Sequence, residues 1–329
     1  MGSDPISCTF LTALIHAPEC EVVGVVSQPD RERGRRLRVV PGPVKELALM
    51  HCVPVFTPEK VNSPESVEEL ARLKPDIIIV MAYGQILRSE ILGMPPLGCV
   101  NLHVSILPRW RGASPVQYAI MAGDKTTGVT AMMMDKGMDT GDILDVACCD
   151  ILPEDTTGSL SLQLSKLGSD LMIDVIRKLQ YGTIKRLPQN NNEATYAPKI
   201  QKECCVIEWS HPAVEIERTI RALNPRPSCH TFLPEKTNAY GELEPGLLLK
   251  IMRASVETLP PRAKLPLPGT VLMMKRGPLI ATGDGMALRL QEVMPEGKPK
   301  PMSGEAFSNG YQNRLKIGDT LFQGFSSLS

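Results

Sequence analysis

The first two hundred residues alternate between short apolar runs and longer amphipathic stretches. The apolar runs are largely continuous in hydrophobicity, which is typical of strands buried on both faces; they lie at residues 21–28, 53–58, 75–83 and 97–105. The stretches between and after them predict helices, at residues 43–52, 63–74, 112–123 and 156–182. Two more extended segments are expected at 127–135 and 141–151. This alternation predicts an α/β fold with a parallel sheet covered on both faces.

The pattern changes after residue 200. A predicted helix at 211–224 leads into short extended runs separated by Gly and Pro, a texture that predicts a small β-barrel; the runs lie at 247–256, 269–275, 278–285 and 286–293. The polar stretch "QNNNEAT" lies between the two patterns. We therefore expect a first domain at 1–188, a linker at 189–205 and a second domain at 206–329.

Composition narrows the class of protein. The 329 residues are 43% hydrophobic and 22% charged, with a formal net charge of zero, which is the balance of a soluble globular protein. No apolar run reaches the length of a membrane span, so no membrane partner is expected. The nine cysteines include no C-x-x-C pair. A disulfide framework and a zinc site are therefore not expected, and a reducing compartment is the simplest interpretation.

Polar side chains stand where the fourth predicted strand ends. Asn101 and His103 are two residues apart, so both point to one face of that strand. Ligands of parallel sheets bind beyond the carboxyl ends of the strands, where the acidic turn with Asp135, Asp139 and Asp142 could converge on His103. Amide, imidazole and carboxylate together supply an oxyanion donor, an acid/base group and an orienting anion. The alternative, a solvated acidic turn beside a core histidine, is favoured on spacing alone.

A second candidate site is the loop "QPDRERGRRLRVVPGP" at 28–43, with Arg31, Arg33, Arg35, Arg36 and Arg38. Arginine side chains suit phosphate contacts, although a solvated surface loop explains the charge equally well. Residues 199–329 hold 17 Lys and Arg against 13 Asp and Glu, a weak hint of nucleic acid. The "RWR" at 109–111 is either a surface clamp or a Trp packed under two exposed arginines. No G-x-G-x-x-G or G-x-x-x-x-G-K-[ST] supports dinucleotide or nucleoside-triphosphate chemistry.

Several stretches together resemble the folate-dependent formyltransferase family, and within it the methionyl-tRNA formyltransferases. They lie between residues 20 and 303 and read "PGPVK", "MAYGQIL", "VNLHVSILPRWRGASP", "TGVTAMMMDKGMDTGDIL", "NPRP" and "ATGDG…PEGKPKPMS". The Asn-x-His strand end with the aspartate of "DTGD" marks the wider family. "LPRWRGASP" and the C-terminal barrel with "NPRP" narrow the resemblance to the tRNA enzymes.

The resemblance implies a Rossmann-like formyltransferase domain with a mostly parallel sheet, followed by a smaller OB-like barrel that binds tRNA. It implies a catalytic triad of Asn101, His103 and Asp139. The implied folate site consists of Ser105, Ile106, Leu107 and Pro108, with Tyr83, Gly84 and Ile86 near the pterin. The five arginines of the loop at 28–43 are implied to contact the acceptor end of the tRNA.

The implied reaction moves a formyl group from 10-formyltetrahydrofolate, the co-substrate, to the α-amine of initiator methionyl-tRNA for translation initiation. No metal is expected, because the leaving nitrogen only has to gain a proton. The implied partners are therefore initiator methionyl-tRNA and the folate. A monomer is expected, in the mitochondrial matrix if the source is eukaryotic or in the cytoplasm if it is bacterial.

The chain departs from the family at its beginning. The family opens with an apolar strand and a Gly-containing turn, whereas this chain opens with "MGSDPISCTF", which predicts no strand. Loss of that strand would remove ladder hydrogen bonds and core contacts. Two rival functions stay open: a formyltransferase for glycinamide ribonucleotide or an amino sugar, and a tRNA-binding protein without activity.

Overall fold

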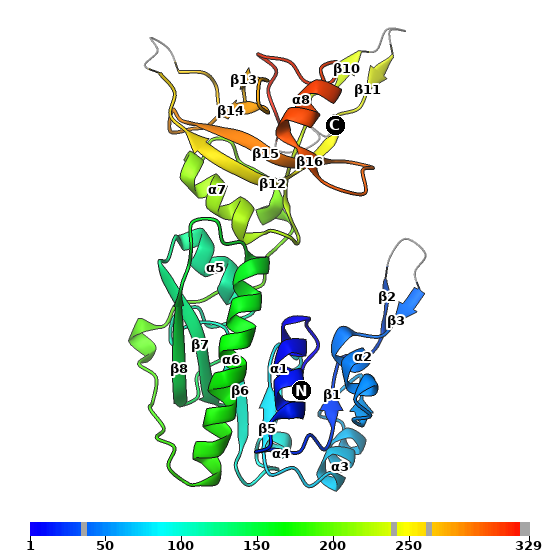
Figure 1. Ribbon diagram of the computed structural model, residues 1–329, viewed down its shortest axis with the longest axis vertical. Helices are drawn as coiled ribbons and strands as arrows, with labels where there is room; N and C mark the ends of the chain where they lie inside the picture. Colours follow the sequence, from blue (N-terminus) through cyan, green and yellow to red (C-terminus); the bar gives the residue numbers. More distant parts are fainter. Residues whose placement is uncertain (34–37, 238–241, 261–264, 323–329) are drawn as a thin grey trace. The chain divides into compact units, whose positions relative to one another are not determined.

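The chain folds into two compact units, which are described separately (Figure 1). The computed structural model describes all residues except 34–37, 238–241, 261–264 and 323–329. The first unit consists of residues 1–116, 125–151 and 159–198. The second consists of residues 117–124, 152–158 and 199–329. No helix among the described residues is long and apolar enough to cross a membrane.

The first unit is built on strands that are parallel on one side and antiparallel on the other. A four-stranded sheet has the order β5 (Ile78–Val80), β6 (Cys99–His103), β7 (Thr126–Met133) and β8 (Ile143–Asp150). β5 and β6 are parallel, while β7 is antiparallel to both of its neighbours. The connection between β7 and β8, residues 134–142, is too short for a parallel crossover, so the two strands form an antiparallel hairpin. The predicted α/β fold with a mostly parallel sheet is confirmed.

Helices cover both faces of these strands. They are α1 (Ile6–His16), α2 (Pro43–Met50), α3 (Pro64–Arg72), α4 (Ser89–Leu92) and α6 (Thr157–Gln180). A further helix, α5 (Pro115–Ala122), belongs mostly to the second unit. The predicted cap Ser63 accepts a hydrogen bond from the Ser66 amide and starts α3. One apolar cluster joins α1 and α2 to Val25, and a second joins α3 and α4 to Val26. Because consecutive strand residues point to opposite faces, the two clusters lie on the two sides of the sheet.

The chain's first residues lie between two strands. β1 (Val25–Val26) pairs in parallel with β4 (Val55–Phe56) in a sheet separate from β5–β8. The Met1 amine donates to the Ile79 carbonyl at 2.6 Å, and the Gly2 amide donates to the Val26 carbonyl at 3.0 Å. Three residues of "MGSDPISCTF" thus occupy a strand position between β1 and β5, and the rest enters α1.

The second unit is a barrel of antiparallel strands. The order is β13 (Val271–Met273), β14 (Leu279–Ala281), β15 (Ala287–Pro295), β12 (Leu248–Glu257) and β9 (Cys229–Phe232), with β16 (Met302–Ser303) beside β15. The segment 318–322 joins the two edge strands, because Val271 donates to the Asp319 carbonyl and Phe322 donates to the Phe232 carbonyl. The sheet is closed in this way, which confirms the predicted barrel.

The remaining elements of the second unit pack on or beside this barrel. They are α7 (Ala213–Ala222), α8 (Gly304–Gly310) and the hairpin of β10 (Lys236–Thr237) and β11 (Leu243–Glu244). Trp209, Ile220 and Phe307 are buried in the same apolar cluster as the strands. Two 3-10 turns, Asn191–Glu193 and Glu203–Cys205, lie in the predicted linker.

Candidate active site

The site begins at the carboxyl end of β6. Val100 and Leu102 of this strand are buried, and Leu102 packs closely on α6 at Gly168. Asn101 and His103 alternate with them and therefore share the opposite face of β6. The backbone of Asn101 lies opposite Val80 of β5. The strand thus places an amide and an imidazole at the sheet edge where β5 also ends.

His103 is buried between two oxygen atoms. Its side chain is 7% exposed. Nε2 lies 2.9 Å from the carbonyl oxygen of Trp110, which can only accept, so Nε2 carries the hydrogen of this bond. Nδ1 lies 3.6 Å from Oδ2 of Asp139, which is an ion-pair distance but too long for a hydrogen bond. The fold therefore brings the predicted pair of His103 and Asp139 together.

Asp139 is fixed by the loops around it. The Gly112 amide donates to Oδ2 at 2.8 Å. The backbone of Asp139 has φ of 57°, a left-handed conformation that Asp tolerates better than most residues. Asp135 stabilises the turn itself, because its Oδ1 accepts a hydrogen bond from the Thr140 hydroxyl at 2.7 Å. Of the three aspartates of this turn, Asp139 is the one that faces the histidine.

The predicted folate stretch is a rigid loop after β6. Thr130 of the neighbouring strand β7 fixes this loop through two hydrogen bonds. Its hydroxyl donates to the Ser105 carbonyl at 2.7 Å and accepts from the Leu107 amide at 3.1 Å. Ser105 and Leu107 are buried, with the Ser105 hydroxyl donating to the Arg109 carbonyl at 2.6 Å. Ile106 and Pro108 are half-buried. The loop therefore turns alternate residues inward for support and leaves the others accessible.

The residues predicted near the pterin lie at the end of β5 but point in different directions. The Tyr83 ring is buried in the cluster with α3 and α4, and this burial raises the pKa of its phenol to about 12. Gly84 has φ of +88° and Ile86 is 82% exposed. Of these three, Ile86 presents an open apolar surface, whereas Tyr83 supports the loop from inside.

A polar cavity of about 560 Å³ opens at this same end of β1 and β5. Its lining includes Ser3, Ser27, Gln28, Arg31, Gly84 and Gln85. Gln28 Nε2 donates to the Tyr83 carbonyl at 3.1 Å, which ties the wall to the loop after β5. Hydroxyls, amides, one guanidinium and the carboxylate of Glu59, which also lines the cavity, suit a polar ligand.

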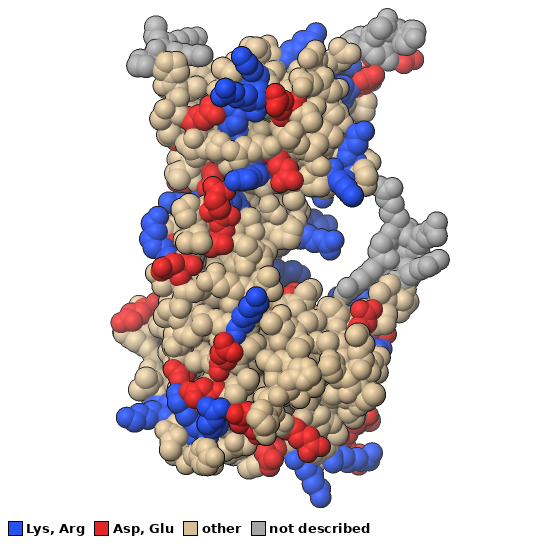
Figure 2. All heavy atoms as spheres, viewed as in Figure 1, with Lys and Arg blue, Asp and Glu red and all other residues tan. Residues whose placement is uncertain are grey.

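The arginine-rich loop forms a β-hairpin. β2 (Arg31–Arg33) pairs antiparallel with β3 (Arg38–Val40), and Arg33 lies opposite Arg38. Lys45 of α2 pairs with Asp30 at 2.7 Å and holds the base of the hairpin. Arg35 and Arg36 lie outside the described residues, and so do the side chains of Arg33 and Arg38. Figure 2 shows basic and acidic side chains mixed over the visible face, without a large patch of one sign. The charge of this face therefore does not indicate where nucleic acid would bind, and the arginines of the loop at 28–43 stay the candidate binding residues.

Sequence reasoning missed the residues that support the site. Arg111 is 2% exposed and donates to Gln189 and Asn191, so the expectation of two exposed arginines is wrong for this one. Gln189 Nε2 donates to the carbonyls of Asp139 and Gly141 at 2.9 and 2.8 Å. Thr195 accepts from the Trp110 amide at 2.9 Å. The stretch "QNNNEAT" thus bonds inward to the loops around His103 and Asp139.

The fold and the site together define a class: a transferase domain with Asn-x-His at a strand end beside an aspartate, followed by a barrel. Residues 9–176 match the formyl transferase family and residues 199–312 match the formyl transferase C-terminal domain. The chain belongs to the formyl transferase family and is a formyl-transferring enzyme.

Curated relatives match almost the whole chain. A methionyl-tRNA formyltransferase of Symbiobacterium thermophilum is 45% identical over 94% of this chain and 91% of its own length. That of Pseudoalteromonas translucida is 43% identical over 97% and 95%. Among solved structures, an N-formyltransferase from Helicobacter canadensis has a TM-score of 0.60 at 18% identity, over 88% of this chain and 96% of its own. At that identity the likeness shows the fold alone.

Proposed function

We propose that this protein transfers a formyl group from 10-formyltetrahydrofolate to the methionine α-amine of initiator methionyl-tRNA, for translation initiation. The observation that carries the proposal is the similarity to methionyl-tRNA formyltransferases, which extends through both domains at 45% and 43% identity. The pairing of His103 with Asp139, beside Asn101 on the same strand, also supports the proposal, because these groups suit formyl transfer.

The reaction sets three tasks for the site. A bond forms between the amine nitrogen and the formyl carbon, and the bond from that carbon to N10 of the folate breaks. The attacking amine loses a proton and the leaving nitrogen gains one. An α-amine has a pKa near ~8, so part of it is unprotonated at neutral pH. The protein has to hold both substrates together, stabilise a developing oxyanion and move a proton.

The residues at the end of β6 suit these tasks. The Asn101 amide donates to the oxyanion, as donors in such sites do. His103 moves the proton through Nε2, because Asp139 stands on the Nδ1 side and orients the ring. Substrate then replaces the Trp110 carbonyl as the partner of Nε2. Gly112 keeps the Asp139 carboxylate in place through its amide.

The two substrates have separate surfaces on the first unit. Ile106 and Pro108 offer accessible apolar surface for the folate ring system on a loop that Thr130 holds. Ile86 adds apolar surface from the loop after β5. The polar cavity beside Arg31 offers hydroxyls and amides for the sugar of the tRNA end and one guanidinium for a phosphate, with the Glu59 carboxylate also in its wall. We assign the arginines of the loop at 28–43 to the acceptor end of the tRNA, and Arg31 lies at the wall of this cavity.

The cellular setting follows from the relatives and the cysteines. The relatives named above come from bacteria, which supports the bacterial cytoplasm. The mitochondrial matrix has no such support. All nine cysteines are free thiols, as a reducing compartment requires.

The test is a formylation assay of the purified chain with 10-formyltetrahydrofolate. Initiator methionyl-tRNA, elongator methionyl-tRNA and a nucleotide-linked amino sugar are offered in parallel, and the formylated product is identified by mass. We expect formylmethionine from initiator tRNA and far less product from the other two. Formylation of the amino sugar alone would favour the rival enzyme, and tRNA binding without product would favour the inactive binding protein.

A further inference from the structure

Arg111 is a buried cation whose side chain bonds to amides. It lies in the loop after β6 and is 2% exposed. Its Nε and Nη2 donate to Oε1 of Gln189 at 3.1 and 2.7 Å, and Nη2 also donates to Oδ1 of Asn191 at 2.9 Å. None of its side-chain partners among the described residues carries a negative charge. Because a buried charge is costly unless it is paired, the use of amides here calls for a reason.

Gln189 makes bonds that a carboxylate in its place could not make. A guanidinium only donates, so Gln189 has to turn its Oε1 toward Arg111 and its Nε2 away from it. Nε2 then donates to the carbonyls of Asp139 and Gly141 at 2.9 and 2.8 Å. A carboxylate has no hydrogen to donate to these carbonyls. The neutral amide therefore connects a group that only donates to two groups that only accept.

The two carbonyls belong to a loop whose conformation needs support. Asp139 has φ of 57°, a left-handed conformation that is strained for a residue with a side chain. A Cβ on Gly141 would clash with the Met133 carbonyl oxygen, so the loop passes close to the end of β7. The two bonds from Gln189 hold the backbone of this loop, and with it the direction in which Asp139 points.

Arg111 also acts on the other end of Asp139, through its main chain. Its amide donates to the Thr195 carbonyl at 2.9 Å, and its carbonyl accepts from the Ala197 amide at 2.7 Å. The next residue, Gly112, is fixed in this way and donates its amide to Oδ2 of Asp139 at 2.8 Å. Arg111 thus holds the aspartate at both ends, at the backbone through its side chain and at the carboxylate through its main chain.

We propose that Arg111 is the positioning residue for Asp139 in the reaction. Arg111 orients Gln189, and Gln189 holds the loop in which Asp139 faces the histidine. Oδ2 of Asp139 then lies 3.6 Å from Nδ1 of His103. This role rests on the formyl transfer proposed above and adds a residue that acts on it only through others. A positioning role disappears where Asp139 is replaced, whereas a role in folding alone does not.

The sharpest test places a carboxylate at either of two positions against the same guanidinium. Gln189→Glu keeps an acceptor for Arg111 and removes the donor to the Asp139 loop. Asn191→Asp is the matched control, because it adds the same charge beside the same nitrogen. Among the described residues, the side chain of Asn191 bonds to Arg111 alone. Both variants give the guanidinium a counter-charge and should fold, which melting curves check.

Two quantities are measured: kcat for formylmethionine at saturating substrates, and hydrogen exchange of the Gly112 amide. In Gln189→Glu we expect kcat to fall about tenfold, because the aspartate is misplaced. The Gly112 amide should exchange about tenfold faster, because its acceptor moves. In Asn191→Asp both quantities should stay within about twofold. In an Asp139→Asn background, Gln189→Glu should change kcat by less than about twofold, since the positioned group is already lost.

The guanidinium itself is tested by Arg111→Met. It should lower kcat by about tenfold, and adding Gln189→Ala should lower kcat no further, because the two residues act in one chain of contacts. Additive losses would contradict that chain. The two carboxylate variants decide the question even if Arg111→Met does not fold.

Three further results would overturn the proposal. Full turnover and unchanged Gly112 exchange in Gln189→Glu would mean that Arg111 only needs partners for its hydrogens. Equal losses in Gln189→Glu and Asn191→Asp would mean that the added charge matters and the Asp139 loop does not. An undiminished loss of kcat in the Asp139→Asn background would mean that Gln189 acts elsewhere. If no form makes formylmethionine, the formyl transfer itself is contradicted, and exchange at Gly112 still decides the role of Arg111.

Discussion

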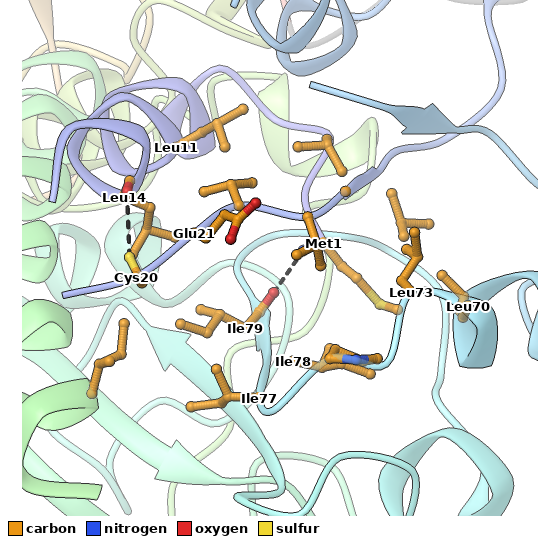
Figure 3. A pocket seen from close by; sticks show the side chains of 17 residues that line it. Met1, Leu11, Leu14, Cys20, Glu21, Leu70, Leu73, Ile77, Ile78 and Ile79 are labelled. Carbon is orange, nitrogen blue, oxygen red and sulfur yellow. Dashed lines mark hydrogen bonds between the residues drawn. The ribbon is translucent and has the colours of Figure 1, made fainter. Parts of the chain in front are cut away.

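The sheet of the first unit is used in two opposite ways at β6 and between β1 and β5. At β6 the strand is paired on both sides, and the loops beyond it are held by Thr130, Gly112 and Gln189. Between β1 and β5 the backbone amides of Val26 and Ile79 face a cavity. The proposed catalytic residues therefore stand on the continuous part of the sheet, and the cavity between β1 and β5 (Figure 3) is the expected weak point for stability. Activity and stability should respond to different changes.

The largest expected effect is on turnover at β6. His103→Ala and Asp139→Asn should each lower kcat by at least ~100-fold, the scale of acid/base and oxyanion groups. Folate binding should survive better than turnover. The measurements are single-turnover formylation and a melting curve of each variant. A near-normal rate in either variant would remove that residue from the triad.

The next effect concerns stability and the apolar cavity between β1 and β5, beside Met1. Fusing a lysine and four alternating Val and Ile residues ahead of Met1 should stabilise the fold, because the added residues pair with β1 and β5 and bury apolar side chains in this cavity. Two buried side chains alone amount to about 3–6 kcal/mol, or roughly 10 °C in Tm. An equally long extension of Ser and Asn is the control. Equal melting temperatures of the two fused chains would show that residues 1–10 already supply what the sheet needs.

A smaller effect on turnover is expected at Gln189. Gln189→Ala removes the amide that links Arg111 to the carbonyl of Asp139, so the aspartate should lose its fixed orientation and kcat should fall by about tenfold. Asn190→Ala changes an exposed neighbour and serves as the control. If KM rises while kcat is unchanged in Gln189→Ala, the residue acts on binding rather than on the aspartate.

The hairpin should affect tRNA affinity alone. Replacing Arg31, Arg33 and Arg38 by Gln should raise KM for tRNA and reduce the slope of log affinity against log salt, by about 0.9 for each phosphate that the protein no longer neutralises. The slope is read from binding curves at several salt concentrations. Turnover at saturating tRNA should stay the same. An unchanged slope would mean that the hairpin is merely solvated.

The smallest effect is a pH dependence of stability. Burial lowers the pKa of the Met1 amine from 8.0 to about 6. The unfolded chain therefore binds this proton more tightly than the folded one, so the stabilisation is complete above pH 8 and is lost as pH falls toward 6. We expect Tm to drop by roughly 2–5 °C over this range. In the fused chain an amide replaces the amine, so a drop of the same size there would exclude Met1 as the cause.

Local patterns predicted much of the fold because their causes are local. The apolar run through Val100 and the cap at Ser63 depend on neighbours a few residues away. The pairing of His103 with Asp139 was predicted by resemblance, since spacing alone favoured a solvated turn. The bonds from Arg111 to Gln189 were not predicted, because they join residues 78 positions apart. A polar stretch looks the same in sequence whether it faces solvent or a buried guanidinium.

The most direct test of the account compares formylation by the 329-residue chain and by the chain with the fused apolar strand. Both are assayed with saturating initiator methionyl-tRNA and 10-formyltetrahydrofolate, at a temperature where melting curves show both to be folded. The account predicts that kcat is the same within about twofold, because the catalytic residues stand on β6 and its loops, while Tm differs. The contrary result is a folded 329-residue chain that makes no formylmethionine when the fused chain does. It would contradict the claim that the cavity between β1 and β5 affects stability but not turnover.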